Sequence, residues 1–390
     1  MIYFDHNATS PMLPLARQAW LEATERYLGN PSSPHRLGGR GEAALTAARE
    51  QLARYLGCEP GDVVWTSGAT ESANTVLQHY ARRRGPRREV WVSAIEHPAV
   101  LAPLGRYFPR AHRLMPVTRA GVLDLDWLHD HLRRARPRLI GLMAANNETG
   151  VIQPWAVVRA LAREHGVPFF CDATQWVGRL PASGLGECDW VGGSAHKFGG
   201  PRGVGFLKCP ADTRLEALLV GGPQEEGRRA GTENVPGIVA MMAALERRET
   251  ALASPDEPGT PGSTPVGLRL AWRERFEEEL RQRLPGTVIL GAGPTRLWNT
   301  VSACLPAADC RQRWVVKLDK LGFAVSTGSA CASGREAPSQ VVAAMGYAAT
   351  EASRVLRFSS GWETTPEEWK ALLAALARVY REFGVAPSRR

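Results

Sequence analysis

Lys197 attracts attention first, because amines are rare in this chain. Only five of its 48 Lys and Arg residues are lysines. Lys197 lies in the segment SAHKFGGPRGVGF, between polar residues and a run of glycines. A lysine amine can attack an aldehyde, whereas an arginine guanidinium stays protonated and delocalised. The position therefore favours chemistry that needs an amine, although a single lysine is also typical of a solvated surface.

Two further polar clusters have the residue types of a cofactor site. In SGATESAN, which follows the strand-like run DVVW, the amides near Ala69 and the hydroxyl of Thr70 can hold a phosphate at a helix N-terminus. The strand-like run VPFFCDATQ ends near Asp172, whose carboxylate can keep a ring nitrogen protonated. Each cluster alone also suits an ordinary helix cap. Together with Lys197, 25 residues after Asp172, they predict pyridoxal 5'-phosphate bound through its phosphate, its ring nitrogen and its aldehyde.

The elements that must position these clusters alternate between strands and helices. Strand-like runs cover residues 89–94, 138–144 and 167–173, and a helical pattern covers residues 155–166. The strands are apolar on both faces, which predicts an α/β fold with a mostly parallel sheet covered by helices. Ligands of such sheets bind at the carboxyl ends of the strands, which is where the polar clusters lie.

The length of 390 residues, 44% of them hydrophobic, is sufficient for two domains. The segment ASPDEPGTPGSTPVG (253–267) is rich in Pro, Gly, Ser and Thr and reads as a linker or exposed loop. We expect a large cofactor-binding α/β domain over 15–252. Residues 1–14 and 268–390 then form a small domain.

The last helix has a clear N-terminal signal. Thr365 suits the N-cap, Pro366 suits the first turn, and Glu368 completes a capping box. An apolar stripe from Trp369 to Phe383 follows, so we expect this helix to pack on the core of the small domain.

Composition excludes several other classes. The formal net charge of +9 comes from dispersed arginines, so direct nucleic-acid binding is not expected. No apolar run reaches the roughly 18 residues of a membrane span, and the N-terminus lacks a secretory signal, which predicts a cytoplasmic protein. The seven cysteines form no C-x-x-C pair and no zinc-like spacing, so neither a disulfide framework nor a metal site is expected.

The order of the motifs resembles that of the cysteine desulfurases, which belong to the class-V aminotransferase group and to fold type I among pyridoxal-phosphate enzymes. The matches run from YFDHNAT to RFSSG and include GNPSSPH, TSGATESAN, EHPAV, NNETG, CDATQ, SAHKFGGPRGVG, RRAGTEN and STGSACASG. The resemblance implies a central sheet of the seven-stranded, mostly parallel type flanked by helices, with a smaller α+β C-terminal domain. The S-x-G-S-A-C pattern resembles the longer-loop subgroup.

The same resemblance implies a set of cofactor contacts. His97 is similar to the family's histidine that stacks on the pyridine ring and moves protons. Asn147 and Gln175 resemble residues near the ring oxygen, and Ser194 and His196 resemble phosphate ligands beside the lysine.

Further roles implied by the resemblance concern the substrate and the assembly. Arg357 resembles the arginine that binds the substrate α-carboxylate, with help from Asn30 and Asn147. Thr232 resembles a phosphate ligand supplied by the neighbouring subunit, which implies a homodimer with shared active sites.

Cys331 is the second candidate nucleophile. Its segment, STGSACASG, consists of small residues that cannot bury much side chain, which predicts a mobile loop. The resemblance implies that Cys331 takes the sulfur of L-cysteine as a persulfide, releases L-alanine, and passes the sulfur to an acceptor such as an iron–sulfur scaffold or a tRNA thiolation protein. His97 is the candidate base for this thiol.

Two other functions stay open at this point. One is a related pyridoxal-phosphate enzyme, such as a selenocysteine lyase or an aminotransferase, in which Cys331 carries no sulfur. The other is a non-catalytic cofactor-binding scaffold, which would have no chemical need for Lys197, Asp172, His97, Cys331 and Arg357 together.

Overall fold

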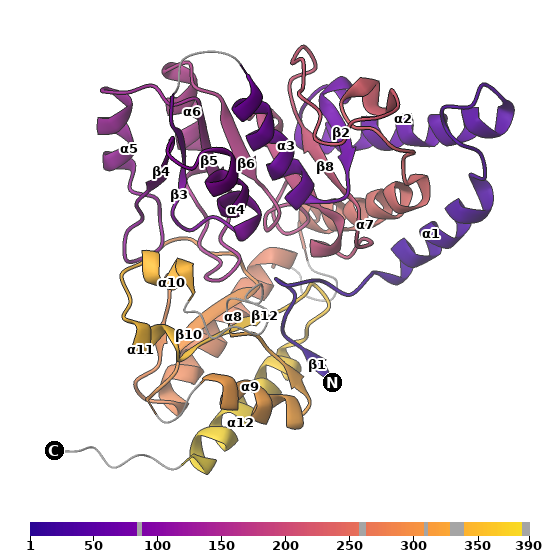
Figure 1. Cartoon of the computed structure of the whole chain (residues 1–390). Helices are drawn as coiled ribbons and strands as arrows, with labels where there is room; N and C mark the ends of the chain where they lie inside the picture. Colours follow the sequence, from indigo (N-terminus) through magenta and orange to yellow (C-terminus); the bar gives the residue numbers. More distant parts are fainter. Residues whose placement is uncertain (84–87, 257–262, 308–310, 328–338, 384–390) are drawn as a thin grey trace.

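A seven-stranded sheet forms the centre of the chain described by the computed structural model, which covers residues 1–83, 88–256, 263–307, 311–327 and 339–383 (Figure 1). Its strand order is β2-β8-β7-β6-β5-β3-β4. The only antiparallel strand within this described sheet is β8, and the mostly parallel sheet expected from the sequence is thereby confirmed. Its strands are β2 (Val63–Thr66), β3 (Val90–Ser93), β4 (His112–Met115), β5 (Leu139–Met143), β6 (Phe169–Asp172), β7 (Trp190–Ser194) and β8 (Gly205–Lys208).

Helices cover both faces of this sheet. In β2, Val63 and Trp65 belong to one hydrophobic core and Val64 to the other, because successive side chains of a strand point to opposite faces. The first core includes residues of α2, α6 and α7, and the second includes residues of α3 and α4. The helices of this part are α1 (Pro14–Arg26), α2 (Arg36–Leu56), α3 (Ala69–Arg82), α4 (Pro98–Tyr107), α5 (Leu125–Leu132), α6 (Trp155–Glu164) and α7 (Val235–Ala253).

A smaller group of elements packs around a separate core, in which Phe4 joins residues between Phe276 and Val379. The N-terminal strand therefore lies with the C-terminal third of the chain, paired with β11. The exact domain boundaries stay a prediction. The elements around this core are β1 (Ile2–Tyr3), β9 (Val288–Ile289), β10 (Thr300–Cys304), β11 (Phe323–Ala324), β12 (Val355–Ser359), α8 (Pro265–Arg283), α9 (Arg311–Lys320) and α12 (Pro366–Glu382). The short helices α10 (Gln340–Ala344) and α11 (Ala349–Ala352) pack in another core, which also includes Ile95.

Two helix starts show what the sequence revealed and what it concealed. At α12 the predicted capping box is confirmed, since Thr365 and Glu368 exchange hydrogen bonds between side chain and backbone. In contrast, α8 begins at Pro265, inside the segment expected to be a linker. The reason is a second cap, because Thr264 Oγ1 accepts the Gly267 N–H at 3.0 Å.

The first two helices extend away from the body of the molecule (Figure 1). On α1, Leu15, Trp20 and Leu21 are exposed although they are large and apolar. Within the described ranges, no helix combines the length and the apolar character needed to cross a bilayer.

Candidate active site

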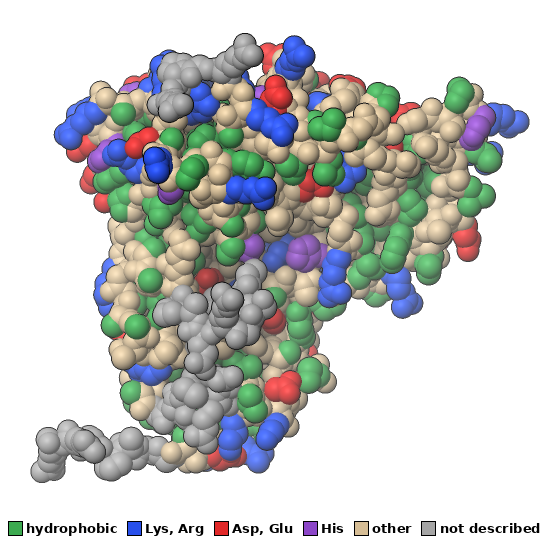
Figure 2. All heavy atoms as spheres, viewed as in Figure 1, with side chains coloured by type: hydrophobic (Ala, Val, Ile, Leu, Met, Phe, Trp, Pro, Cys, Tyr) green, Lys and Arg blue, Asp and Glu red, His purple; other side chains and the backbone are tan. Residues whose placement is uncertain are grey.

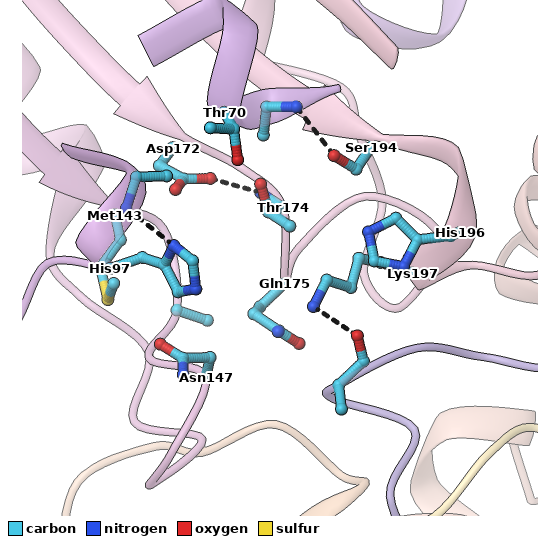
Figure 3. Close-up of a pocket in the computed structure, with 14 residues that line it drawn as sticks. Thr70, His97, Met143, Asn147, Asp172, Thr174, Gln175, Ser194, His196 and Lys197 are labelled. Atoms are coloured by element: carbon cyan, nitrogen blue, oxygen red, sulfur yellow. Dashed lines mark hydrogen bonds between the residues drawn. The ribbon is translucent and has the colours of Figure 1, made fainter. Parts of the chain in front are cut away.

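A cavity of about 200 Å³ lies where β5, β6 and β7 end and α3 begins. Its volume is roughly that of six or seven water molecules, which is room for a small organic ligand. Histidine and basic side chains gather on the face shown in Figure 2 between the large sheet and the smaller group of elements. The cavity lining includes nine of the ten predicted cofactor-binding residues (Figure 3): Ala69, Thr70, His97, Asn147, Asp172, Gln175, Ser194, His196 and Lys197.

One end of the cavity is built from the first turn of α3. Gly68 precedes this helix with a φ of 151°, and a Cβ at this position would lie 3.1 Å from Ser194 Oγ, so glycine permits the close approach. The Ala69 N–H donates to Ser194 Oγ at 2.8 Å. Thr70 lines the cavity beside them. A helix N-terminus with adjoining hydroxyls is suited to bind a phosphate.

Lys197 closes the short 3-10 helix η3 (Ala195–Lys197), which directly follows β7. Its Nζ donates to the backbone oxygen of Asn7 at 2.6 Å and to that of Ala8 at 3.0 Å. The backbone oxygen of Lys197 accepts the Ser10 hydroxyl at 3.0 Å. The N-terminal segment therefore holds both the amine and the backbone of this lysine.

His196 supports the same end of the cavity. Its Nδ1 lies 3.1 Å from Thr9 Oγ1. Burial, and then the positive charges of Lys197 and Arg202, lower the pKa of His196 to about 4. The ring is therefore neutral at neutral pH and can donate one hydrogen bond to an anion.

Two buried carboxyl groups lie at the ends of β3 and β6. Asp172 lines the cavity, and its Oδ1 accepts the Thr174 N–H at 3.0 Å. Behind it, Glu96 Oε1 accepts the Met143 N–H at 2.6 Å. Burial, and then the negative charge of Asp172, raise the pKa of Glu96 well above its ordinary value. The raised pKa favours the protonated form of Glu96, which limits the negative charge next to Asp172.

His97 caps α4, and the cap fixes its tautomer. Its Nδ1 accepts the Ala99 N–H at 3.1 Å, so the proton of the neutral ring sits on Nε2. Burial lowers the pKa of His97, against the opposing charge of Asp172. A neutral ring in this tautomer is a donor at Nε2. The roles predicted for His97, in stacking on the ring and as the base for the Cys331 thiol, stay predictions.

Arg357 lies beside the cavity on the small sheet and is only 1% exposed. Its Nη2 forms a 2.7 Å ion pair with Asp5 Oδ1, and its Nη1 donates to the backbone oxygen of Asn147 at 3.0 Å. The guanidinium thus contacts the loop that carries a lining residue. Its planar fork is suited to a carboxylate.

Two predicted site residues, Thr232 and Asn30, do not meet the others in the described part of this chain. Thr232 lines a different cavity, together with Ser67 and Arg229. Asn30 is exposed between α1 and α2, where its Oδ1 accepts the Ser32 N–H at 3.0 Å. Cys331 lies outside the described residues, as does the loop around it that the sequence predicts to be mobile.

The polar groups of the cavity leave acceptors for a ligand. Three buried side-chain oxygens on its wall, Asn147 Oδ1, Thr174 Oγ1 and Gln175 Oε1, have no hydrogen-bond partner in the described part of the chain. Buried oxygens are normally paired, so a ligand with polar ring substituents fits this wall. Together with the helix N-terminus, Asp172 and Lys197, the residues present fit pyridoxal phosphate.

Sequence reasoning missed Asn7, Glu96 and Thr174. Glu96 and Thr174 lie next to the predicted residues His97 and Gln175, whereas Asn7 lies in the motif YFDHNAT, in which no site residue was predicted. Their contacts with distant segments are not encoded in local spacing.

The comparisons with known proteins agree with this geometry. The family model described as aminotransferase class-V matches residues 2–372. A cysteine desulfurase of Klebsiella pneumoniae is 39% identical over 381 residues, covering 96% of this chain and 91% of that protein. A cysteine desulfurase of Cereibacter sphaeroides is 38% identical over 382 residues, covering 96% and 94%. A solved structure described as a NifS-like protein has a TM-score of 0.86 at 30% identity, covering 98% of this chain and 99% of its own.

Proposed function

The chain belongs to the class-V aminotransferases and is a pyridoxal-phosphate-dependent cysteine desulfurase, and from this premise we propose how its residues carry out the reaction. Enzymes of this kind take L-cysteine as substrate and transfer its sulfur to an acceptor. Neither a transaminase nor a non-catalytic scaffold is favoured by these relatives.

The cavity residues divide into groups that would hold the cofactor at opposite ends. The α3 N-terminus with Thr70, Ser194 and His196 would bind the phosphate, and Asp172 would pair with the ring nitrogen. Gln175 and Asn147 would supply the acceptors of the ring-oxygen side. When bound, pyridoxal phosphate withdraws electrons from the α-carbon of an amino acid.

Two residues of this chain act on the substrate skeleton. Arg357 binds the α-carboxylate, assisted by the Asn147 loop to which it donates, and so orients the α-carbon. The Lys197 amine removes the α-proton and later returns a proton to the carbon skeleton, which leaves as L-alanine.

Cys331 accepts the sulfur. Its thiolate attacks the substrate sulfur, so that a sulfur–sulfur bond forms while the carbon–sulfur bond breaks, and the electron pair of the broken bond stays with the carbon skeleton. The product on the protein is a Cys331 persulfide, which is passed to an iron–sulfur scaffold or a tRNA thiolation protein.

A homodimer would complete this site. Thr232 lies away from the cavity of its own chain, which suits a residue that serves the partner subunit. The extended α1–α2 arm also exposes Leu15, Trp20 and Leu21, apolar side chains that a second copy could cover. We place this assembly in the cytoplasm.

The convergence of nine predicted residues on one cavity with unpartnered polar oxygens carries the proposal. The test is to load the purified protein with pyridoxal phosphate, add L-cysteine, and measure alanine together with protein-bound sulfur by intact mass. We expect both products from the wild type and neither persulfide nor sustained turnover from Cys331→Ala. Cys58→Ala, which removes a half-buried thiol, serves as the matched control.

The alternatives give different outcomes. If Cys331→Ala keeps cysteine turnover, or only selenocysteine is processed, the sulfur-carrier role of Cys331 is wrong. If the loaded wild-type protein forms no alanine from cysteine, the whole proposal fails.

A further inference from the structure

Asn7 is a polar residue near the cavity whose side chain and backbone are both hydrogen-bonded to distant segments, yet its side chain does not line the cavity. Asn7 is 1% exposed. Its two side-chain N–H groups donate to the Asn147 backbone oxygen at 3.0 Å and to Thr300 Oγ1 at 2.9 Å. Its Oδ1 accepts from Asn299 Nδ2 at 3.0 Å. Every donor and acceptor group of the amide is thus used to tie the N-terminal segment to parts of the chain far away in sequence.

The backbone N–H and carbonyl oxygen of Asn7 are also hydrogen-bonded. Its N–H donates to Ser359 Oγ at 3.0 Å. Its carbonyl oxygen accepts both Gln175 Nε2 at 3.0 Å and Lys197 Nζ at 2.6 Å. The amine also donates to the next carbonyl, that of Ala8. The positions of these two carbonyl oxygens therefore depend on the anchoring of Asn7.

Asn7 also connects the lysine to the arginine of the site. The Asn147 backbone oxygen accepts from Asn7 Nδ2 and from Arg357 Nη1, both at 3.0 Å. Lys197 thus donates to Asn7 itself, and Arg357 donates to the Asn147 carbonyl oxygen that Asn7 also contacts. A shift of Asn7 would change the place of the amine relative to the guanidinium.

We propose that Asn7 is a positioning residue that sets the place of the Lys197 amine relative to Arg357, and that in the chain freed of cofactor the carbonyl oxygens of Asn7 and Ala8 hold this amine in place by hydrogen bonds. This inference rests on the proposed function, because it assigns the group that positions the base of that reaction. Carbonyl oxygens are acceptors only, so an amine that donates hydrogen bonds to two of them reacts more slowly with acylating reagents than a solvated amine.

The test measures the lysine itself in the full chain freed of cofactor. With only five lysines, trace labelling by acetic anhydride and mass spectrometry gives a rate for each amine. We compare acetylation of Lys197 with that of Lys370, which is exposed, and use buried Lys208 as a second internal reference. In Asn7→Ala we expect the ratio of Lys197 to Lys370 to rise about fivefold to tenfold, as expected for a weakened charge-assisted hydrogen bond.

Thr300→Val is the matched control, because it removes one hydrogen bond to Asn7 and leaves the bond to Asn147 in place. It should lower the melting temperature while the Lys197 ratio stays within about twofold of the wild type. The Lys208 ratio should stay constant in both variants. If Asn7→Ala does not fold, the ratio of Lys197 to Lys370 acetylation is measured in Asn7→Ser, where the same rise of about fivefold to tenfold is expected.

A second measurement uses the loaded enzyme. Misplacing both the amine and the guanidinium should lower kcat and raise KM for cysteine in Asn7→Ala, whereas a purely structural loss would reduce only the active fraction. An unchanged Lys197 ratio in folded Asn7→Ala would overturn the proposal. This outcome is separate from failure of the proposed function, which would show as absence of alanine with the wild-type enzyme.

Discussion

Lys197 and Lys208 lie at the two opposite edges of the central sheet that the ends of its strands form. Lys197 follows the end of β7, whereas Lys208 pairs with Val191 and Val63, where β7 and β2 begin. Both amines donate to backbone oxygens, Lys208 to that of Cys188 at 2.8 Å. Lys208 also lies 3.9 Å from Asp62 Oδ2, which makes it part of a buried ion pair.

The difference between the two edges lies in their neighbours. At the Lys208 edge, Asp62 accepts the Ala211 N–H and Asp189 accepts the Phe169 N–H, so the protein itself pairs these carboxylates. At the Lys197 edge, buried oxygens on the cavity wall have no partner within the described ranges. Burial of a lysine is thus common to both edges. The Lys197 edge is distinguished by the convergence of three unpaired oxygens on the same cavity that Asp172 and Lys197 line.

Replacing Lys197 gives the largest expected effect on turnover, and replacing Lys208 is the comparison. Lys197→Ala should lower alanine formation by about 10³-fold or more, because it removes the amine that moves the proton, while the fold is retained. Lys208→Met should keep turnover within about twofold but lower the free energy of unfolding by roughly 1–3 kcal/mol, because Asp62 and the Cys188 carbonyl lose their partner. Steady-state alanine assays and urea denaturation check both. Equal losses of turnover would break the comparison.

Asp172 and Asp189 allow the same comparison between the two edges of the sheet. Asp172→Asn should reduce kcat about 10²-fold, since the amide cannot hold the ring nitrogen in its protonated form. Asp189→Asn removes an exposed carboxylate at the other edge, which likewise accepts a backbone N–H, and should leave kcat nearly unchanged. The measurement is kcat at saturating cysteine, with the absorbance of the bound cofactor as a check on loading. A comparable fall in Asp189→Asn would contradict the assignment.

These contrasts also separate what the sequence predicts from what it does not. The strand ending in Asp172 and the turn before α3 were predictable, because apolar runs and helix caps are local patterns. Asn7 was not, because its partners lie 140 to 352 residues away in the chain. The shifted pKa of Glu96 depends on burial, which only the fold creates. No local residue pattern encodes the separation of Thr232 from the cavity of its own chain, which only the family resemblance implied.

Glu96 offers a test with a smaller effect. Glu96→Gln keeps the acceptor for the Met143 N–H and mimics the protonated acid, so turnover should stay within about twofold. Glu96→Ala leaves that amide unpaired and a space behind Asp172, so kcat should fall about tenfold. The opposite ranking would show that Glu96 acts as a carboxylate.

The pH dependence of stability checks the same point. A raised pKa in the folded state means that the stability contributed by Glu96 is present below the ordinary glutamate value of 4.5 and is lost as the pH rises above it. Relative to the wild type, Glu96→Gln should therefore gain melting temperature between pH 5 and pH 8, measured by calorimetry across about that range. A constant difference would mean that the pKa of Glu96 is ordinary.

Substitutions of two histidines, one at each edge of the sheet, give the smallest predicted effect. Burial lowers the pKa of both His196, at the cavity, and His79, on α3 away from it, to about 4. A lowered pKa means that the stability each ring contributes is present above 6.5 and is lost as the pH falls toward 4. His79→Asn and His196→Asn should each reduce this acid sensitivity by on the order of 1 kcal/mol, because asparagine does not titrate. Only His196→Asn should also weaken pyridoxal-phosphate binding, about tenfold by fluorescence titration, because only His196 faces the cavity. Weaker cofactor binding in both variants would mean that the two edges are not independent.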